Sequence, residues 1–372
     1  MLVGVPKETK SGEFRVGLTP ASVSQFAAHG HTILVETGAG AGIGFEDDAY
    51  RLARADIAAD AGAVFGAAAM IVKVKEPLAP ERKMLRADQI LFTYLHLAAD
   101  RDQTVDLMNS GAVCIAYETV TDAQGRLPLL APMSQVAGRL SIQAGAHSLE
   151  KAHGGAGILL GGVPGVAPAK VLGIGGGVVG ENAVEIALGM GAEVVVLDLN
   201  VDVLARLRHR FGVALKTVYA TNDATERYPL DSDLVVGAVL VPGAAAPKLV
   251  TSAQVERMKP GAVLVDVAID QGGCFQTSVP TTHEAPTYTV AGVVHYCVAN
   301  IPSAVPRTAT QALINVTLPF GLAIADKGYE RALAEDPHLL RGLNVCKGRV
   351  TNGPVARHLG YDCVAPTTAL AA

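Results

Sequence analysis

The sequence predicts an α/β fold with two doubly wound, mainly parallel sheets. A chain of 372 residues is long enough for about two domains of 150–200 residues. Forty glycines, no tryptophan and only 5% aromatic residues are typical of a chain with many tight strand–helix junctions. Short aliphatic runs also alternate with polar-faced helical segments, which predicts parallel strands joined by right-handed crossovers.

The first third of the chain has this alternation. Aliphatic runs predict buried strands at 1–6, 32–36, 70–74, 89–94 and 113–116. The segments between them have helical spacing and predict helices at 20–28, 47–53, 79–86 and 100–108.

A second series of strands and helices follows a long helix that we expect over 132–153. A connection rich in Gly and Pro, 154–168, must turn sharply. The clearest strands after it are 170–174, 193–197, 234–236, 262–267 and 288–290, and another long helix is expected over 308–327.

The composition argues against several classes of protein. There are 30 Lys and Arg against 35 Asp and Glu, so the basic stripe that binds nucleic acid is missing. The longest uncharged stretch, 154–169, is shorter than the about 20 residues of a membrane span and contains Gly and Pro. The N-terminal residues lack the charge order of a secretory signal. Five cysteines without a C-x-x-C pair favour reduced thiols and a cytoplasmic location.

A glycine-rich loop at 175–180 fits the pattern G-x-G-x-x-G between an expected strand and an expected helix. Gly175 is expected to make the tight turn, Gly177 to let the backbone approach a pyrophosphate, and Gly180 to let helix and strand pack closely. Asp198 ends the next strand, where a carboxylate accepts hydrogen bonds from a ribose diol. Strand, loop, helix and acid together predict a dinucleotide site, and the carboxylate favours NAD over NADP.

Arg15 lies where the first strand ends, an edge at which ligands bind in open α/β sheets. Its guanidinium suits a bidentate carboxylate. The alternative is a surface arginine paired with Glu8 or Glu13.

Two more expected strands are followed by side chains that could take part in catalysis. In 72–77 we expect Lys73 to be a solvated edge residue and Lys75 to polarise a carbonyl or imine. His96 follows the strand 89–94 and is a candidate general acid or base, although a structural histidine is the alternative. The other histidines show no metal-ligand spacing.

In the second half, the strand 262–267 continues into two acids. Asp266 lies within the apolar run and suits a capping or structural role, whereas Asp270 lies at the exit of the strand. The segment 298–302 is expected to be a buried loop that closes over a nicotinamide.

These residues lie in segments that resemble bacterial L-alanine dehydrogenases over essentially the whole chain. The segments that carry the resemblance include GVPKETKSGEFRVGLTPASV (4–23), VKVKEP (72–77), LFTYLHLA (91–98), MKPGAVLVDVAIDQGG (258–273) and YCVANIPSAVP (296–306).

The resemblance implies an oxidoreductase that converts L-alanine to pyruvate and ammonium with NAD as cofactor. It implies that Arg15 binds the substrate carboxylate and Lys75 its carbonyl or imino group. His96 acts as general acid or base, and Asp270 is the second catalytic residue. Besides the glycine loop with Val178 and Val179, the implied NAD contacts are Ser134, Asp198, Val239, Leu240, Val267, Ala268, Ile269, Val298, Ala299, Asn300 and Ile301.

The resemblance also implies the domain arrangement. Two Rossmann-like domains are expected on either side of a deep cleft, with an NAD domain (131–306) inserted into a substrate domain (1–130 and 307–372). Related proteins usually form homohexamers.

The chain departs from the family pattern in places. Val178 and Val179 stand where smaller residues are usual, and Val203 stands where relatives often have a basic residue near the ribose. Some relatives bind a divalent metal on the late long helix, but Ala323 and Lys327 offer no ligands there, so no metal is expected.

Three other functions remain open. They are the NAD-binding subunit of a proton-translocating transhydrogenase, a non-catalytic NAD-binding scaffold, and an opine-type dehydrogenase. The set of Arg15, Lys75, His96 and Asp270 argues against the first two, and the third needs a larger pocket.

Overall fold

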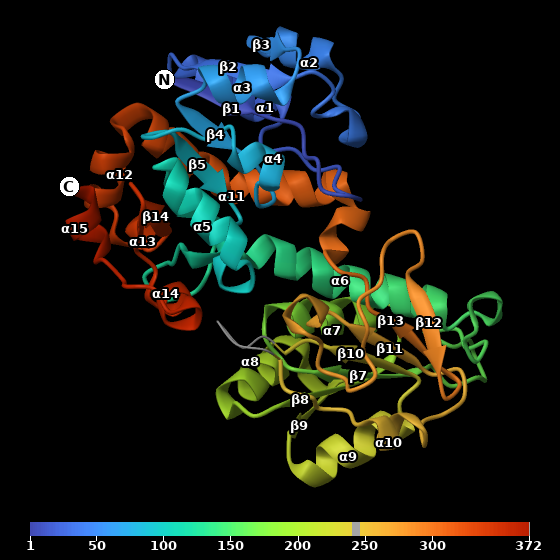
Figure 1. Ribbon diagram of the computed structural model, residues 1–372. Coiled ribbons are helices and arrows are strands. Elements are labelled where there is room, and N and C mark those ends of the chain that lie inside the picture. Colours follow the sequence, from blue (N-terminus) through green and yellow to red (C-terminus); the bar gives the residue numbers. More distant parts are fainter. Residues whose placement is uncertain (240–245, 372) are drawn as a thin grey trace. The chain divides into compact units, whose positions relative to one another are not determined.

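The computed structural model describes residues 1–239 and 246–371. The chain divides into two compact units, each with its own sheet (Figure 1). Unit 1 consists of Met1–Met133 and Val305–Ala372, and unit 2 of Ser134–Ala304.

The sheet of unit 1 has the strand order β15-β14-β6-β5-β4-β1-β2-β3. The six strands from β6 to β3 are all parallel, and β14 and β15 add an antiparallel edge. The order reverses between β1 and β4. The strands are β1 (Leu2–Val5), β2 (Thr32–Glu36), β3 (Ala55–Ala58), β4 (Met70–Val72), β5 (Ile90–Thr93), β6 (Val113–Ala116), β14 (Leu343–Cys346) and β15 (Arg349–Val350).

The helices of unit 1 begin with recognisable caps. Thr19 forms a capping box with Ser22, and Pro20 occupies the first turn of α1. Asp100 accepts a hydrogen bond from the backbone of Gln103 and so starts α5. The helices are α1 (Pro20–Ala28), α2 (Asp47–Leu52), α3 (Ala61–Ala67), α4 (Ala79–Arg82), α5 (Arg101–Ser110), α11 (Pro306–Lys327), α12 (Tyr329–Glu335), α13 (Pro337–Leu340), α14 (Gly353–Leu359) and α15 (Pro366–Leu370).

The sheet of unit 2 repeats this topology in the order β12-β13-β11-β10-β7-β8-β9. All pairs are parallel except the β12–β13 edge pair, and the order reverses between β7 and β10. The strands are β7 (Lys170–Ile174), β8 (Glu193–Asp198), β9 (Leu215–Tyr219), β10 (Leu234–Gly237), β11 (Val263–Asp266), β12 (Thr287–Val290) and β13 (Val293–Tyr296). The expected fold class, two Rossmann-like doubly wound sheets, is confirmed.

The helices of unit 2 are α6 (Ala131–Ser148, which starts in unit 1), α7 (Val178–Gly189), α8 (Val201–Phe211), α9 (Asn222–Asp231) and α10 (Ser252–Val255). The expected helix over 132–153 is too long, because α6 ends at Ser148. The chain then turns back tightly, since a Cβ on Gly155 would lie 2.3 Å from the carbonyl oxygen of Ser148. A separate 3₁₀ turn, η4, covers Lys151–His153.

Several elements were not expected from the sequence, among them β3, α3, β9 and β13. The strand β3 and the helix α3 are rich in Ala and Gly and lack a clear apolar run. The strand β9 lies at the edge of its sheet, and β13 pairs with β12 across a two-residue turn. Both central sheets are otherwise aliphatic and buried, as their continuous Val, Leu and Ile runs predict.

Among the described residues, one helix, α11, is long and apolar enough by length and composition to cross a membrane. In its most apolar window 44% of the residues are buried inside the structure. Ala309, Leu313 and Ile324 are among its buried side chains, and α11 contacts α1 and α12 of the same unit. The helix thus contributes to the core of unit 1.

Candidate functional site

The substrate candidates of unit 1 follow the carboxyl ends of three neighbouring strands. Arg15 follows β1, Lys75 follows β4 and His96 follows β5, and these strands are adjacent in the sheet. The order of strands reverses between β1 and β4, and ligands bind outside the carboxyl ends of the strands at such a point. The topology therefore places three residues that are far apart in the sequence after neighbouring strands of one sheet.

Arg15 is 2% exposed and is held by Glu13. Its Nε and Nη2 donate to the two Glu13 carboxylate oxygens at 2.7 and 2.5 Å, and its Nη1 lies 3.0 Å from the Met133 sulfur. Burial alone would lower the pKa of Arg15, but the hydrogen-bonded Glu13 carboxylate raises it. The surface arginine that the sequence left open is therefore excluded, although the pairing with Glu13 is correct. The sequence indicated Glu13 only as an ion-pair partner of Arg15.

Lys73 is fully buried, so the expectation of a solvated edge residue is wrong. Its ammonium donates to Glu81 at 2.7 Å and to Glu8 at 3.2 Å. Glu8 also accepts the backbone N–H of Val74 at 2.7 Å. Burial raises the pKa of Glu8, and the charge of Lys73 opposes this. Both carboxylates lie at a distance in the sequence, so the local pattern around Lys73 could not reveal them.

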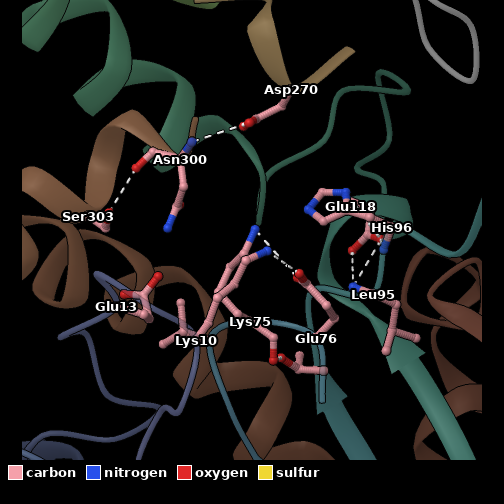
Figure 2. Close-up of polar contacts among 12 residues, drawn as sticks. Lys10, Glu13, Lys75, Glu76, Leu95, His96, Glu118, Asp270, Asn300 and Ser303 are labelled. Atoms are coloured by element: carbon pink, nitrogen blue, oxygen red, sulfur yellow. Dashed lines mark hydrogen bonds and ion pairs between the residues drawn. The ribbon is translucent and has the colours of Figure 1, made fainter. Parts of the chain in front are cut away.

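Lys75 lies in a chain of alternating charges with Glu76 and Lys10 (Figure 2). Its Nζ is 3.4 Å from Glu76, and the other Glu76 oxygen accepts from Lys10 at 2.5 Å. Burial would raise the pKa of Glu76, but Lys75 and Lys10 together lower it to about 2. The side chain of Lys75 is 11% exposed, so its ammonium is largely withdrawn from solvent.

His96 occupies a left-handed backbone conformation, with φ of 51°. Such a conformation is uncommon for a residue other than glycine. Glu118 stabilises it by accepting the backbone N–H groups of His96 at 2.6 Å and of Leu95 at 3.2 Å. The same carboxylate lies 3.9 Å from Nδ1 of His96. The imidazole is stacked on Tyr94, and its side chain is 47% exposed.

The glycine loop of unit 2 connects β7 to α7. Gly175 has φ of 99°, and a Cβ on Gly180 would lie 1.8 Å from the carbonyl oxygen of Gly175, so both positions need glycine. A Cβ on Gly177 would meet no atom within 4 Å. Gly177 caps the N-terminus of α7, where unpaired backbone N–H groups attract a phosphate. Val178 is exposed and Val179 is half-buried.

Asp198 lies at the end of β8 and contacts the glycine loop directly. Its carboxylate accepts the backbone N–H of Gly176 at 2.6 Å and of Asn200 at 2.7 Å. One turn of α8 after Val203, Arg206 donates to the carbonyl oxygen of Gly176 at 3.1 Å. Sequence reasoning considered position 203 and missed this basic residue. The three-residue spacing from Val203 to Arg206, about one turn of a helix, could have indicated it.

Asp266 and Asp270 have different roles in the loop after β11. Asp266 is fully buried, and its carboxylate accepts the backbone N–H of Cys274 at 2.9 Å and the hydroxyl of Ser278 at 2.5 Å. It therefore has the structural role that was one of its expected roles. Asp270 is exposed in the next 3₁₀ turn and accepts the backbone N–H of Asn300 at 3.2 Å (Figure 2).

The loop 298–302 is only partly buried, contrary to expectation. Val298 and Ile301 are buried, whereas Ala299 is exposed and Asn300 is half-buried with φ of 57°. The contact between Asp270 and Asn300 nevertheless brings together two segments that were expected to form one site.

The remaining expected NAD contacts also belong to unit 2. Ser134 lies one helical turn before Gly138 of α6, and a Cβ on Gly138 would lie 2.2 Å from the carbonyl oxygen of Val179. The side chain of Val239 lies beside Gly175. Val267 is half-buried and both Ala268 and Ile269 are buried, while Leu240 lies outside the described residues.

Comparison with known proteins gives the same family for both units. Residues 4–137 match the alanine dehydrogenase/PNT N-terminal domain, and residues 141–353 match the alanine dehydrogenase/PNT C-terminal domain. The chain belongs to the alanine dehydrogenase/PNT family.

Individual relatives agree over nearly the full length. The chain is 59% identical to an alanine dehydrogenase of Halomonas elongata over 98% of both chains. It is 53% identical to that of Bacillus subtilis over 100% of this chain and 98% of the relative. A solved L-alanine dehydrogenase structure superposes with a TM-score of 0.93 at 50% identity, covering 97% of this chain and 99% of that one. A transhydrogenase from Sinorhizobium meliloti has the same fold at a TM-score of 0.81 and 22% identity, with 95% and 99% coverage.

Proposed function

We propose that the protein catalyses the reversible, NAD-dependent oxidative deamination of L-alanine. The reaction is L-alanine + NAD⁺ + H₂O ⇌ pyruvate + NH₄⁺ + NADH + H⁺. The observation that carries the proposal is the placement of Arg15, Lys75 and His96 at three adjacent strand ends of unit 1, in a chain 59% identical to an alanine dehydrogenase. We assign substrate binding to unit 1 and NAD binding to unit 2.

Arg15 binds the substrate carboxylate. Glu13 accepts hydrogen bonds from the Nε–Nη2 edge of the guanidinium, and the Met133 sulfur lies against Nη1. The short bonds to Glu13 hold the guanidinium in one orientation before the substrate arrives. The fork geometry makes arginine better than lysine for this role.

Lys75 and His96 act on the C2 atom of the substrate. The Lys75 ammonium polarises the amino, imino or carbonyl group that C2 carries. After oxidation of C2 the imine takes up water, and His96 removes the proton of that water. Glu118, which fixes the backbone of His96 and faces its Nδ1, is a positioning residue for this step.

NAD supplies the hydride acceptor that this reaction needs when it is bound to unit 2. The glycine loop suits the group, because the open space at Gly177 and the N-terminus of α7 suit a pyrophosphate. Asp198 accepts hydrogen bonds from the adenosine ribose and repels a 2′-phosphate. Asp270, held by Asn300, orients water or the departing amine.

The direct test follows the absorbance of NADH in both directions. With L-alanine and NAD⁺ the absorbance should rise, and with pyruvate, ammonium and NADH it should fall. A transhydrogenase subunit would instead exchange hydride between two nicotinamide nucleotides without alanine, and a scaffold would show neither reaction. An absorbance that changes in neither direction would reject the proposal.

The assay also resolves two finer points. Initial rates with serine, 2-aminobutyrate and glyoxylate define how selective the pocket is for a three-carbon substrate. We further propose a cytoplasmic homo-oligomer, with a hexamer as the expected size, and light scattering on the purified protein measures that size.

A further inference from the structure

Three potential metal ligands lie together at the end of α6 in unit 2. In the sequence they precede the glycine loop and are not part of it. His147 is in the last turn of α6, Glu150 follows it, and His153 ends the turn η4. One ligand atom from each residue lies within 4.8 Å of the other two. The spacing His-x₂-Glu-x₂-His was not recognised as a metal pattern in the sequence.

The contacts within this cluster are close. His147 Nδ1 lies 3.4 Å from one Glu150 oxygen, and His153 Nε2 lies 3.8 Å from the other. The centroids of the two imidazole rings are 3.8 Å apart. Tetrahedral ligand atoms at about 2.0–2.2 Å from zinc lie roughly 3.4 Å from one another. Small rotations of these side chains are therefore enough to bring all three donors onto one ion.

The backbone that carries the three ligands is fixed by hydrogen bonds. The N–H of Glu150 donates to the carbonyl oxygen of His147 at 3.2 Å, and the N–H of His153 donates to that of Glu150 at 3.0 Å. Gly155 closes the turn onto Glu150 at 3.2 Å, and it fits there because it lacks a side chain. Between the ligands, Leu149 is fully buried and anchors the turn. The ligands thus project from a defined scaffold.

We propose that His147, Glu150 and His153 form a binding site for a divalent transition-metal ion, with Zn²⁺ as the occupant. Two imidazoles and one carboxylate are typical zinc ligands, whereas Mg²⁺ and Ca²⁺ prefer sites made of oxygen ligands. Three protein ligands leave a coordination position for water.

The surroundings leave room for that water. The side chains of His147, Glu150 and His153 are 61%, 59% and 40% exposed. Both imidazoles line a cavity of about 560 Å³, which Thr287 and Tyr296 also line. An ion held here would join the end of α6 to η4 and present its open position to solvent or to the cavity.

The test is a calorimetric titration of the assembled protein with ZnCl₂, carried out in a Cys363→Ser background. Cys363 is the exposed thiol among the described residues and is a competing zinc ligand. We expect one Zn²⁺ per chain. His147→Ala and His153→Ala should each weaken binding by about tenfold or more, and Glu150→Gln by less. MgCl₂ should give no heat of binding at this site.

The matched control is His209→Ala, which removes another exposed histidine of unit 2 from α8. It should leave the affinity and the stoichiometry of Zn²⁺ binding unchanged. Equal zinc affinity in the His147→Ala, His153→Ala double variant would overturn the proposal, as would the absence of zinc binding by the parent protein.

A second measurement covers the case in which a variant folds poorly. An ion that binds only the folded state raises Tm in proportion to the logarithm of its concentration. Zn²⁺ should therefore raise the Tm of the parent protein and of His209→Ala, but raise that of the His147→Ala, His153→Ala double variant much less at the same concentration. An equal rise in all three proteins would place the zinc elsewhere.

Discussion

The two units share the order of their six parallel strands but use the carboxyl ends of these strands differently. In unit 1, charged side chains follow the strand ends and are paired and largely buried, as in Arg15 with Glu13 and Lys73 with Glu8. In unit 2, the first strand ends in glycines, and the backbone itself forms the surface at Gly177. One topology therefore supports two kinds of recognition.

The difference follows from what each site must bind. A small carboxylate has few atoms, so it needs strong, fixed charges such as a buried guanidinium. A dinucleotide is large, and its pyrophosphate binds to a helix N-terminus only where the backbone can approach closely. In the proposed function, unit 1 supplies the charges and unit 2 supplies the backbone.

The largest expected effect is a loss of kcat caused by a change in unit 1 that leaves NADH binding to unit 2 unchanged. His96→Ala should lower kcat for alanine oxidation by about 10²–10⁴-fold, because the proton acceptor for water is lost. The Kd of NADH, measured by fluorescence titration, should stay unchanged. His358→Ala, an exposed histidine in α14 of the same unit, is the control. Near-normal kcat in His96→Ala would remove this residue from the mechanism.

The second effect concerns the buried charges of unit 1. The pKa of Glu76 is about 2 in the folded protein, whereas a glutamate without charged partners, as in the unfolded chain, has a pKa of 4.5. The ionised carboxylate therefore stabilises the folded state above pH 4.5. That contribution is lost as the pH falls from 4.5 towards 2. Glu76→Gln should therefore lower the free energy of unfolding at pH 7 by on the order of 2–3 kcal/mol.

Urea unfolding at several pH values measures this contribution. The difference between Glu76→Gln and the parent protein should shrink as the pH is lowered below 4.5. Glu256→Gln, an exposed position at the end of α10, should show little difference at any pH. A constant difference between pH 7 and pH 3 would show that lost packing, rather than lost charge, destabilises the Glu76 variant.

The smallest effect concerns selectivity in unit 2. Asp198→Ala should raise kcat/KM for NADPH relative to NADH by about tenfold, because the carboxylate that repels a 2′-phosphate is removed. Asp202→Ala, an exposed acid in the first turn of α8, should leave the ratio unchanged. An unchanged ratio in Asp198→Ala would mean that another group sets the selectivity, and Arg206, which donates to the Gly176 carbonyl oxygen, would be the next residue to change.

The sequence predicted the fold class and the residues at the strand ends because these depend on local patterns. Aliphatic runs mark β4 and β5, and the side chain after each run marks the edge of the sheet. The prediction failed where a residue's environment is set by residues that are far from it in the sequence. Lys73 is buried because Glu8 and Glu81 neutralise it, and neither is its neighbour in sequence. The end of α6 depends on a tight turn at Gly155, which packs against the backbone of Ser148.

The pairing of Arg15 with Glu13 has a consequence for affinity. Removing water from a guanidinium is unfavourable, and in this protein it happens when the chain folds rather than when a ligand arrives. Alanine has six non-hydrogen atoms, and even the best small ligands gain only about 1.5 kcal/mol for each. In the proposed function, Glu13 has already dehydrated and aligned the Arg15 cation before alanine binds, so the few contacts of this small molecule all contribute to its recognition.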